Sequence, residues 1–230
     1  MELINEVNKF NKTTPIFTNW ITVRQAIEEM HNNSFPKWKE AEWAGFYLEY
    51  LYSSYIDKNH IQNIIEYLNN KSSLTRHLDF DLYFHNANFY GDLKSSSSSE
   101  KSTMLNDKSN ILFELNSYGK LWYLIYEHDT VKDRDLDGHP FTKSRLEYIR
   151  LFEPNYKLGE DLSYYQRLKA KVKYCKMFIV EINKINYSSL LEEMTSNFHQ
   201  PDGTTLRQPK LKFTKENIKN AIVYSYFPTN

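Results

Sequence analysis

Residues 79–94 constrain the fold of this chain more than any other segment, because apolar and acidic side chains alternate on both sides of a short polar turn. Side chains alternate across a strand, so Asp92 and Lys94 are expected to point the same way. If the turn is centred on residues 86 and 87, Asp81 lies directly opposite Asp92 in an antiparallel hairpin. Facing residues bring their Cβ atoms within roughly 4.5–5.5 Å of each other. Two carboxylates that close repel unless a cation lies between them or one takes up a proton, so the hairpin predicts a site for a hard divalent ion, above all Mg²⁺.

At these positions the sequence resembles the PD-(D/E)XK nuclease superfamily, to which most restriction endonucleases belong. The family pattern is an Asp, a spacer, and then Asp or Glu, any residue, and Lys on the next strand. The matching residues here are Asp81 (or Asp79), Asp92, Leu93 and Lys94. The proline of the motif's name is absent before both candidate first acids.

The resemblance implies an α/β protein with a restriction-endonuclease-like fold, in which helices flank a central mixed sheet in an α/β/α sandwich. It further implies a Mg²⁺-dependent, site-specific endonuclease of the type II restriction class. Such an enzyme hydrolyses phosphodiester bonds of double-stranded DNA as a homodimer, and a cognate DNA methyltransferase is its genetic partner.

The resemblance also assigns roles to the site residues. Asp81 and Asp92, with the backbone carbonyl of Leu93, are expected to hold one or two Mg²⁺ ions, and Asp79 is the substitute ligand if the hairpin is shifted by one pair. Lys94 is expected to orient or deprotonate the attacking water and to stabilise the transition state. The nearby carboxylates favour its charged form, so electrostatic stabilisation is the safer assignment. A fourth family residue often comes from an upstream helix, where Glu49 matches and Glu42 is the alternate.

Two further groups are candidate DNA contacts. The hydroxyls of Ser95 and Ser96 directly follow Lys94 and are expected to bind a phosphate, although five consecutive serines are equally typical of a flexible loop. Between residues 195 and 209 lies a segment rich in side chains that hydrogen-bond base edges. Its candidate readers are Asn197, His199, Gln200, Arg207 and Gln208, and an ordinary surface loop is the alternative.

Length and composition narrow the class of protein. A chain of 230 residues is long enough for a single well-buried domain. We expect a helical part (1–70), a catalytic sheet core (74–130) and a C-terminal part (155–230) of helices, strands and the recognition loop. The acidic N-terminus lacks the apolar core of a signal peptide, and no apolar run approaches the ~18 residues of a membrane span. With only one cysteine, these features predict a cytoplasmic protein without disulfides.

Charge is unevenly distributed although the net charge is zero. Residues 1–70 carry six Lys and Arg against nine Asp and Glu, whereas residues 155–230 carry twelve against seven. A basic C-terminal third beside an acidic site suits an enzyme that grips phosphates with one part and binds metal with another.

Hydrophobic periodicity predicts the elements around the hairpin. The expected helices cover residues 1–12, 21–30, 37–56, 61–68, 162–175, 187–194 and 215–222. The expected strands beyond the hairpin cover residues 111–115, 121–126, 177–182 and 211–213.

Two other functions fit the same residues. One is a non-catalytic module that binds nucleic acid or protein, in which the acids of the hairpin are solvated. The other is a nuclease of the same fold that acts in repair or on structured substrates.

Overall fold

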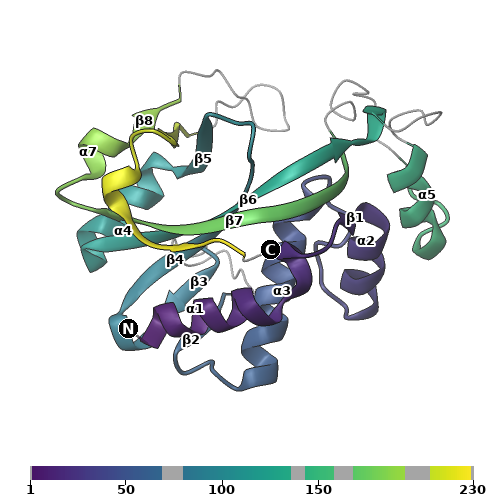
Figure 1. Ribbon diagram of the computed structural model, residues 1–230, viewed down its shortest axis with the longest axis horizontal. Coiled ribbons are helices and arrows are strands. Elements are labelled where there is room, and N and C mark those ends of the chain that lie inside the picture. Colours follow the sequence, from purple (N-terminus) through teal and green to yellow (C-terminus); the bar gives the residue numbers. More distant parts are fainter. Residues whose placement is uncertain (1, 69–79, 136–142, 158–167, 195–207, 229–230) are drawn as a thin grey trace.

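The computed structural model describes residues 2–68, 80–135, 143–157, 168–194 and 208–228. Within these ranges the chain is mixed α/β, as expected, with a large mixed sheet, a small second sheet and helices on both sides (Figure 1). None of the described helices is long and apolar enough to cross a membrane.

The helices and strands follow one another in three stretches. The first contains α1 (Glu2–Thr13), β1 (Ile21–Thr22), α2 (Val23–Asn32) and α3 (Trp43–Asn59). The second contains β2 (Ile65–Tyr67), β3 (Leu82–Phe84), β4 (Phe89–Ser97), β5 (Ser102–Asp107), α4 (Lys108–Tyr118) and β6 (Lys120–Lys132). The third contains α5 (Lys143–Phe152), β7 (Lys169–Asn183), α7 (Tyr187–Leu190), β8 (Glu192–Glu193), β9 (Lys210–Thr214) and β10 (Ile222–Tyr226).

The large sheet has the strand order β1-β7-β6-β4-β3-β2, and β10 also pairs with β7. Its described pairs are antiparallel except β4 with β6, which run parallel and are linked through β5 and α4. The small sheet has the order β5-β9-β8. The long strands β6 and β7 run across the whole molecule and separate its two layers (Figure 1).

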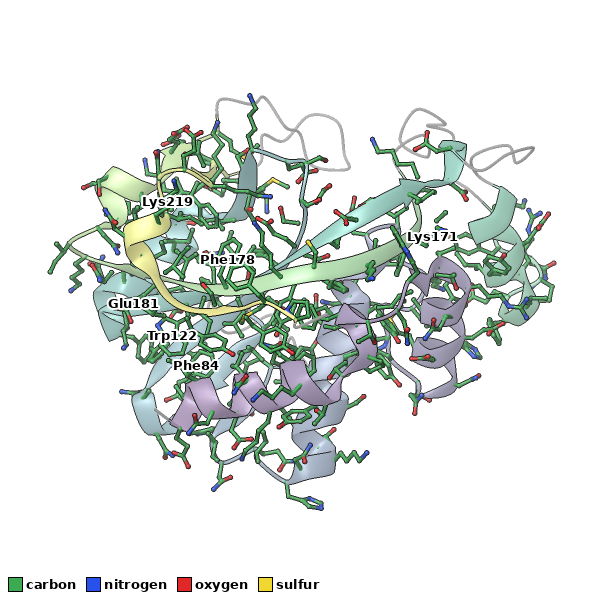
Figure 2. All side chains as sticks on the ribbon, in the orientation of Figure 1. Phe84, Trp122, Lys171, Phe178, Glu181 and Lys219 are labelled. Atoms are coloured by element: carbon green, nitrogen blue, oxygen red, sulfur yellow. The ribbon has the colours of Figure 1, made fainter. Side chains whose placement is uncertain are left out.

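Each face of the large sheet covers its own hydrophobic core. On one face, helices α1, α2 and α3 pack through Phe10, Ile27 and Leu48. Phe84 and Trp122 belong to this core and lie on the side of α1 in Figure 2, with ring centroids 5.5 Å apart. On the other face, α4 and the small sheet bury apolar side chains against β6 and β7, among them Ile111, Leu115, Tyr123, Phe178 and Phe213.

The predicted hairpin forms with the predicted register. Leu82 pairs with Gly91 and Phe84 with Phe89, so the turn is centred on residues 86 and 87. The turn is a short 3₁₀ segment that ends at Asn88 in the left-handed conformation, with φ 51°. Gly91 lies so close to Phe84 that a Cβ atom there would be 2.6 Å from the Phe84 ring. Strand β4 also pairs in parallel with β6 and is therefore held on both sides.

The prediction for residues 111–115 was wrong, because they lie in helix α4 and not in a strand. Ile111 and Leu115 are buried at the i, i+4 spacing of one helix face. The helix ends at Gly119, whose φ of 82° is the usual left-handed cap, so the glycine closes a helix and does not turn a hairpin. The next predicted strand, 121–126, is confirmed within β6 at the centre of the sheet.

The helix predicted over 162–175 was also wrong where the structure describes it. From residue 169 onward the chain is strand β7, which includes the strand predicted over 177–182. Ala170, Val172 and Tyr174 are buried while the residues between them are partly exposed, which is the alternation of a strand. Cys175, expected in that helix, is a half-buried residue of β7.

Three other predicted helices are replaced or shortened. Residues 65–67 form strand β2, α7 ends at Leu190, and the segment 215–222 contains only a 3₁₀ turn before β10. The three N-terminal helices are confirmed, although α3 begins at Trp43 and not at Lys37. The short strand 211–213 is confirmed within β9.

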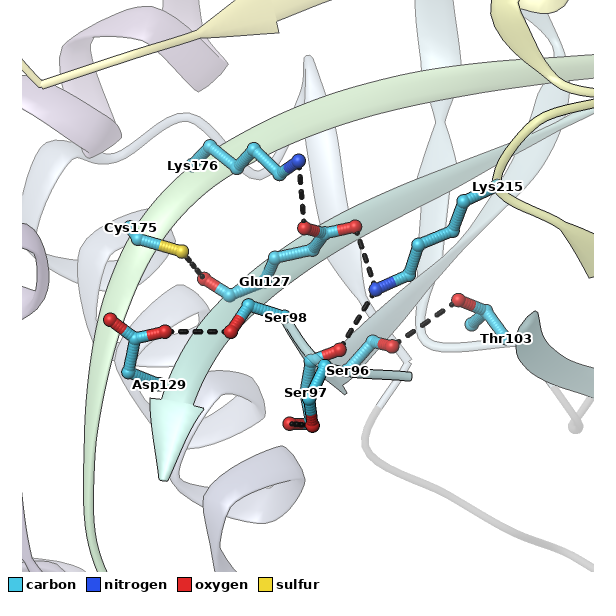
Figure 3. A network of polar contacts seen from close by, with 10 residues as sticks. Ser96, Ser97, Ser98, Thr103, Glu127, Asp129, Cys175, Lys176 and Lys215 are labelled. Carbon is cyan, nitrogen blue, oxygen red and sulfur yellow. Dashed lines mark hydrogen bonds and ion pairs between the residues drawn. The ribbon is translucent and has the colours of Figure 1, made fainter. Parts of the chain in front are cut away.

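A buried carboxylate joins the small sheet to the end of β4 (Figure 3). Glu127 of β6 forms ion pairs at 2.9 Å with both Lys176 and Lys215. The Lys215 ammonium also donates to the backbone carbonyl of Ser97 at 2.8 Å. Because Lys215 follows β9, this network fixes the end of the strand that carries Asp92 and Lys94.

Candidate active site

The structure brings the predicted acids and lysine together at one place on the hairpin. The Lys94 ammonium lies 2.5 Å from Oδ2 of Asp92, which is 1% exposed. Asp81 immediately precedes β3, and its Oδ2 accepts a hydrogen bond from the backbone N–H of Leu93 at 3.0 Å. The register of the hairpin places Asp81 next to Asp92, one step beyond the last pair of the ladder.

The two aspartates oppose each other electrostatically. Burial raises the pKa of Asp81 well above its ordinary range, and the negative charges of Asp92 and Glu49 raise it further. The positive charge of Lys94 and the hydrogen bond from Leu93 act in the opposite direction without outweighing these causes. Asp81 therefore holds its proton to a higher pH than an ordinary aspartate, and an added cation would favour its ionised form.

Lys94 is held in its charged form. Burial disfavours the ammonium, but the carboxylates of Asp92 and Asp81 outweigh burial and raise the pKa of Lys94. A lysine in this state donates hydrogen bonds and stabilises negative charge, and it is a poor general base at neutral pH.

Glu49 reaches the same site from helix α3. Its Oε2 accepts hydrogen bonds from the Lys37 ammonium at 2.9 Å and from the Tyr67 hydroxyl at 2.7 Å. Burial raises the pKa of Tyr67, and the negative charges of Glu49 and Asp81 raise it further, which ties the three residues to one electrostatic environment. The alternate candidate, Glu42, has a 70% exposed side chain and lies 4.0 Å from Lys169.

Sequence reasoning missed three residues of this site. Tyr67 was hidden because its segment was predicted to be a helix, whereas β2 pairs it with Leu82 next to Asp81. Lys37 lies within a segment that was predicted to be helical. It precedes α3 instead, and its ammonium forms an ion pair with Glu49 in that helix. Tyr123 faces Asp92 across the β4–β6 ladder, and burial followed by the charges of Asp92 and Asp81 raises its pKa. No local pattern marks these three residues, because each contact joins segments that are distant in the sequence.

The site offers oxygen ligands for a hard divalent ion. No group of three or more His, Cys, Asp or Glu side chains in the described ranges is arranged to hold a metal ion. Mg²⁺, however, usually keeps several waters and binds through one or two carboxylates. Asp81 and Asp92 provide that donor set, and their mutual repulsion is what a cation between them would remove, so the residues fit Mg²⁺.

The predicted DNA contacts are placed less favourably. Strand β4 continues through Ser97, so Ser95 and Ser96 belong to a strand and not to a flexible loop. Ser96 is buried, and its hydroxyl accepts a hydrogen bond from Thr103 at 3.3 Å, which points it away from solvent. The Ser95 hydroxyl lies 3.3 Å from that of Tyr174. Gln208 is exposed just before β9.

The remaining predicted residues lie outside the described ranges. They are Asp79, Asn197, His199, Gln200 and Arg207. Comparisons with protein-family models, curated proteins and solved structures found no match to this chain. The geometry of the described residues is therefore the basis for any functional conclusion.

Proposed function

We propose that this protein is a Mg²⁺-dependent endonuclease that hydrolyses phosphodiester bonds of double-stranded DNA at specific sites, as type II restriction enzymes do. The observation that carries the proposal is the meeting of Asp81, Asp92 and Lys94 at one end of the β3–β4 hairpin. The spacing Asp-x-Lys on β4 puts an acid and a lysine on one face of the strand.

Each residue has a distinct part in the proposed reaction. Asp81 and Asp92 would hold Mg²⁺, with the carbonyl of Leu93 as a further oxygen ligand. When bound, the ion lowers the pKa of a coordinated water and neutralises charge on the scissile phosphate. Lys94 remains protonated, donates hydrogen bonds to the phosphate oxygens and stabilises the charge that develops in the transition state. Glu49 adds negative charge to the site and forms an ion pair with the ammonium of Lys37.

The arrangement of layers supports the same class of enzyme. Helices α1, α2 and α3 cover one face of the mixed sheet, and α4 with the small sheet covers the other (Figure 1). We propose that this is a restriction-endonuclease-like α/β/α sandwich whose second outer layer includes the small sheet.

The proposal extends to assembly and context. The described residues contain one such site per chain, so a homodimer would place one site on each strand of a palindrome. A cytoplasmic enzyme of this kind would require a cognate DNA methyltransferase that protects the host DNA.

The decisive experiment incubates purified protein with unmethylated phage DNA, with and without Mg²⁺. Lys94→Ala removes the proposed stabilising charge, and Lys108→Ala, which removes an exposed ion pair with Glu193, is the matched control. Discrete fragments that require Mg²⁺ and Lys94 but not Lys108 are the expected result.

Other outcomes separate the alternatives. DNA that stays intact in every condition would overturn the proposal in favour of a non-catalytic binding module. A Mg²⁺-dependent smear would preserve the hydrolytic chemistry and remove the sequence specificity, as expected for a repair nuclease.

A further inference from the structure

The last strand of the large sheet has one open edge in the described part of the chain. Strand β10 pairs with β7 along one side, and none of the described strands pairs with its other side. In Figure 1 it is the yellow strand that leads to the C-terminus, alongside β7. An irregularity separates Ile222 from Tyr224, and the pairing with β7 is regular from Tyr224 to Tyr226. The backbone N–H and C=O groups along such an edge can pair with another strand.

The other edges of the described sheets differ from that of β10. Edge strands β2 and β5 contain Glu66 and Asp107, and both residues of β8 are glutamates. Strand β1 has only two residues. Charged side chains and short strands are common means by which proteins prevent edge-to-edge pairing. Strand β10 has five residues, and residues 220–230 contain no charged side chain, so this edge lacks both means.

Exposed apolar side chains accompany the open edge of β10. Val223 is 43% exposed and Phe227 is 67% exposed, and the exposed Ser225 lies between them. Tyr224 and Tyr226 alternate with these residues and pack against the core beside α1. Side chains alternate across a strand, so the three exposed residues share the face opposite the two tyrosines.

A second copy of this chain fits the edge because the edge is complementary to itself. Antiparallel strands of two identical chains pair across a twofold axis, which makes each contact twice. A register centred on Ser225 places this serine opposite its own copy and Val223 opposite Phe227 of the second copy. Facing apolar side chains on neighbouring strands stabilise the pair, and an uncharged strand brings no like charges together.

We infer that β10 pairs with β10 of a second copy about a twofold axis at Ser225, so that the two large sheets become one continuous sheet. The inference rests on the homodimer of the proposed function and names the surface through which that homodimer forms. Strands this short cover less area than a permanent interface, so the dimer is expected to dissociate on dilution.

Sedimentation velocity over a series of protein concentrations tests the interface, without DNA and with a chelator. Wild-type protein is expected to shift from monomer to dimer as its concentration rises. Ser225→Lys places two like charges opposite each other on the axis, so the dissociation constant should rise at least about tenfold. Ser188→Lys, at an exposed serine of α7, is the matched control and should behave as the wild type does.

Charge pairs test the register. Val223→Lys combined with Phe227→Lys brings lysines opposite each other in both halves of the interface and should prevent dimers. Val223→Lys combined with Phe227→Glu places each lysine opposite a glutamate and should restore them. Circular dichroism verifies that each variant is folded. Dimers of the first double variant, or none of the second, would overturn the register.

A thiol at position 225 gives a second measurement that does not need a charged variant. In a Cys175→Ser background, which removes the single native cysteine, Ser225→Cys is expected to oxidise to a covalent dimer. Ser188→Cys in the same background is expected to stay monomeric. Failure of Ser225→Cys to crosslink would overturn the inference even if Ser225→Lys did not fold.

The outcomes distinguish this inference from the proposed function. A dimer that Ser225→Lys leaves unchanged would overturn the β10 interface and keep the homodimer. A wild-type protein that stays monomeric at every concentration would overturn both the interface and the homodimer. Neither result decides the hydrolysis of DNA, which the cleavage assay with Lys94→Ala measures separately.

Discussion

At the scale of single residues, Asp81 is the residue at which the electrostatics of the candidate site lower the stability of the folded protein. Burial and the charge of Asp92 raise its pKa, so the folded protein keeps a proton on Asp81 at pH values where the unfolded chain has lost it. Stability linked to this group therefore falls as pH rises from the ordinary pKa of 3.8 through the raised folded pKa. This loss of stability agrees with a site that functions only with an added cation.

Asp81→Asn is expected to stabilise the metal-free protein. The amide removes the charge and keeps an oxygen that accepts the Leu93 N–H. We expect the free energy of unfolding in urea with a chelator to rise by on the order of 1 kcal/mol near neutral pH, and the gain to vanish below the ordinary Asp pKa. Asp57→Asn, at an exposed helix position, is the control and is expected to change little. A gain of equal size at every pH would contradict the electrostatic explanation.

His128 is expected to make the stability of the protein depend on pH in the opposite direction. Burial, and after it the positive charge of Lys169, together lower the pKa of its fully buried ring from 6.5 to about 3. The Lys169 ammonium only donates, so Nε2 accepts from it at 3.4 Å and Nδ1 carries the hydrogen toward Thr130. The unfolded chain then binds a proton that the folded protein excludes, so stability is lost as pH falls from 6.5 toward 3.

His128→Gln is expected to reduce this pH dependence. In the wild-type protein the free energy of unfolding should fall by up to about 1.4 kcal/mol per pH unit between about pH 6.5 and pH 5, before most carboxylates titrate. The glutamine amide does not titrate and can still hydrogen-bond both neighbours, so the slope should flatten. His85→Gln, at an exposed histidine whose Nε2 lies 2.9 Å from Oε2 of Glu66, is the matched control. Equal slopes in the wild-type and His128→Gln proteins would show that His128 is protonated in the folded state.

At the scale of elements, the hairpin depends on a close approach of Gly91 to Phe84. A Cβ atom at residue 91 would lie 2.6 and 2.8 Å from two atoms of a fully buried ring. Gly91→Ala is therefore expected to cost about 1–3 kcal/mol of stability, measured by urea unfolding. It should also reduce cleavage, because the displaced strand carries Asp92.

Gly45 provides the matched control. It lies in helix α3, and a Cβ atom there meets nothing within 4 Å. Gly45→Ala is expected to stabilise the protein by about 0.5–1 kcal/mol through helix propensity. If both substitutions were neutral, the contact with Phe84 would not set the position of β4.

The same elements show what sequence can predict. The hairpin was correct in position and register because alternation and a polar turn are both local signals. The alternating segment from Lys169 to Tyr174 carried the same kind of signal, yet it was interpreted as an amphipathic helix because its apolar residues also recur at helical spacing. Short apolar runs such as residues 111–115 fit helix and strand equally well, and only the cap at Gly119 distinguishes them.

The candidate site was predictable only in part for a related reason. Asp81, Asp92 and Lys94 lie within one hairpin, so strand geometry was enough to bring them together. The partners of Glu49 come from residues 37 and 67, which meet only after β2 joins the sheet edge beside α3. Such contacts depend on tertiary packing and leave no pattern in a single sequence.

At the scale of the whole molecule, the proposed nuclease activity requires an account of how two strands of DNA would be cut. The large sheet is covered on both faces, and the described residues contain one Asp81–Asp92–Lys94 site at the end of one hairpin. A single site that cuts one strand at a time needs either a second copy or a second encounter to break a duplex. The homodimer we propose supplies the second copy through a twofold axis that matches a palindromic target.

Mixed dimers test this arrangement. Wild-type and Lys94→Ala chains carrying different tags are co-expressed, and dimers with one chain of each kind are purified and incubated with supercoiled plasmid and Mg²⁺. Because only one site in each mixed dimer can stabilise the transition state, we expect nicked circles to accumulate. Wild-type dimers should give linear DNA, and Lys94→Ala dimers should leave the plasmid supercoiled. Linear DNA from mixed dimers at the wild-type rate would mean that one chain cuts both strands, and the twofold arrangement would then be wrong.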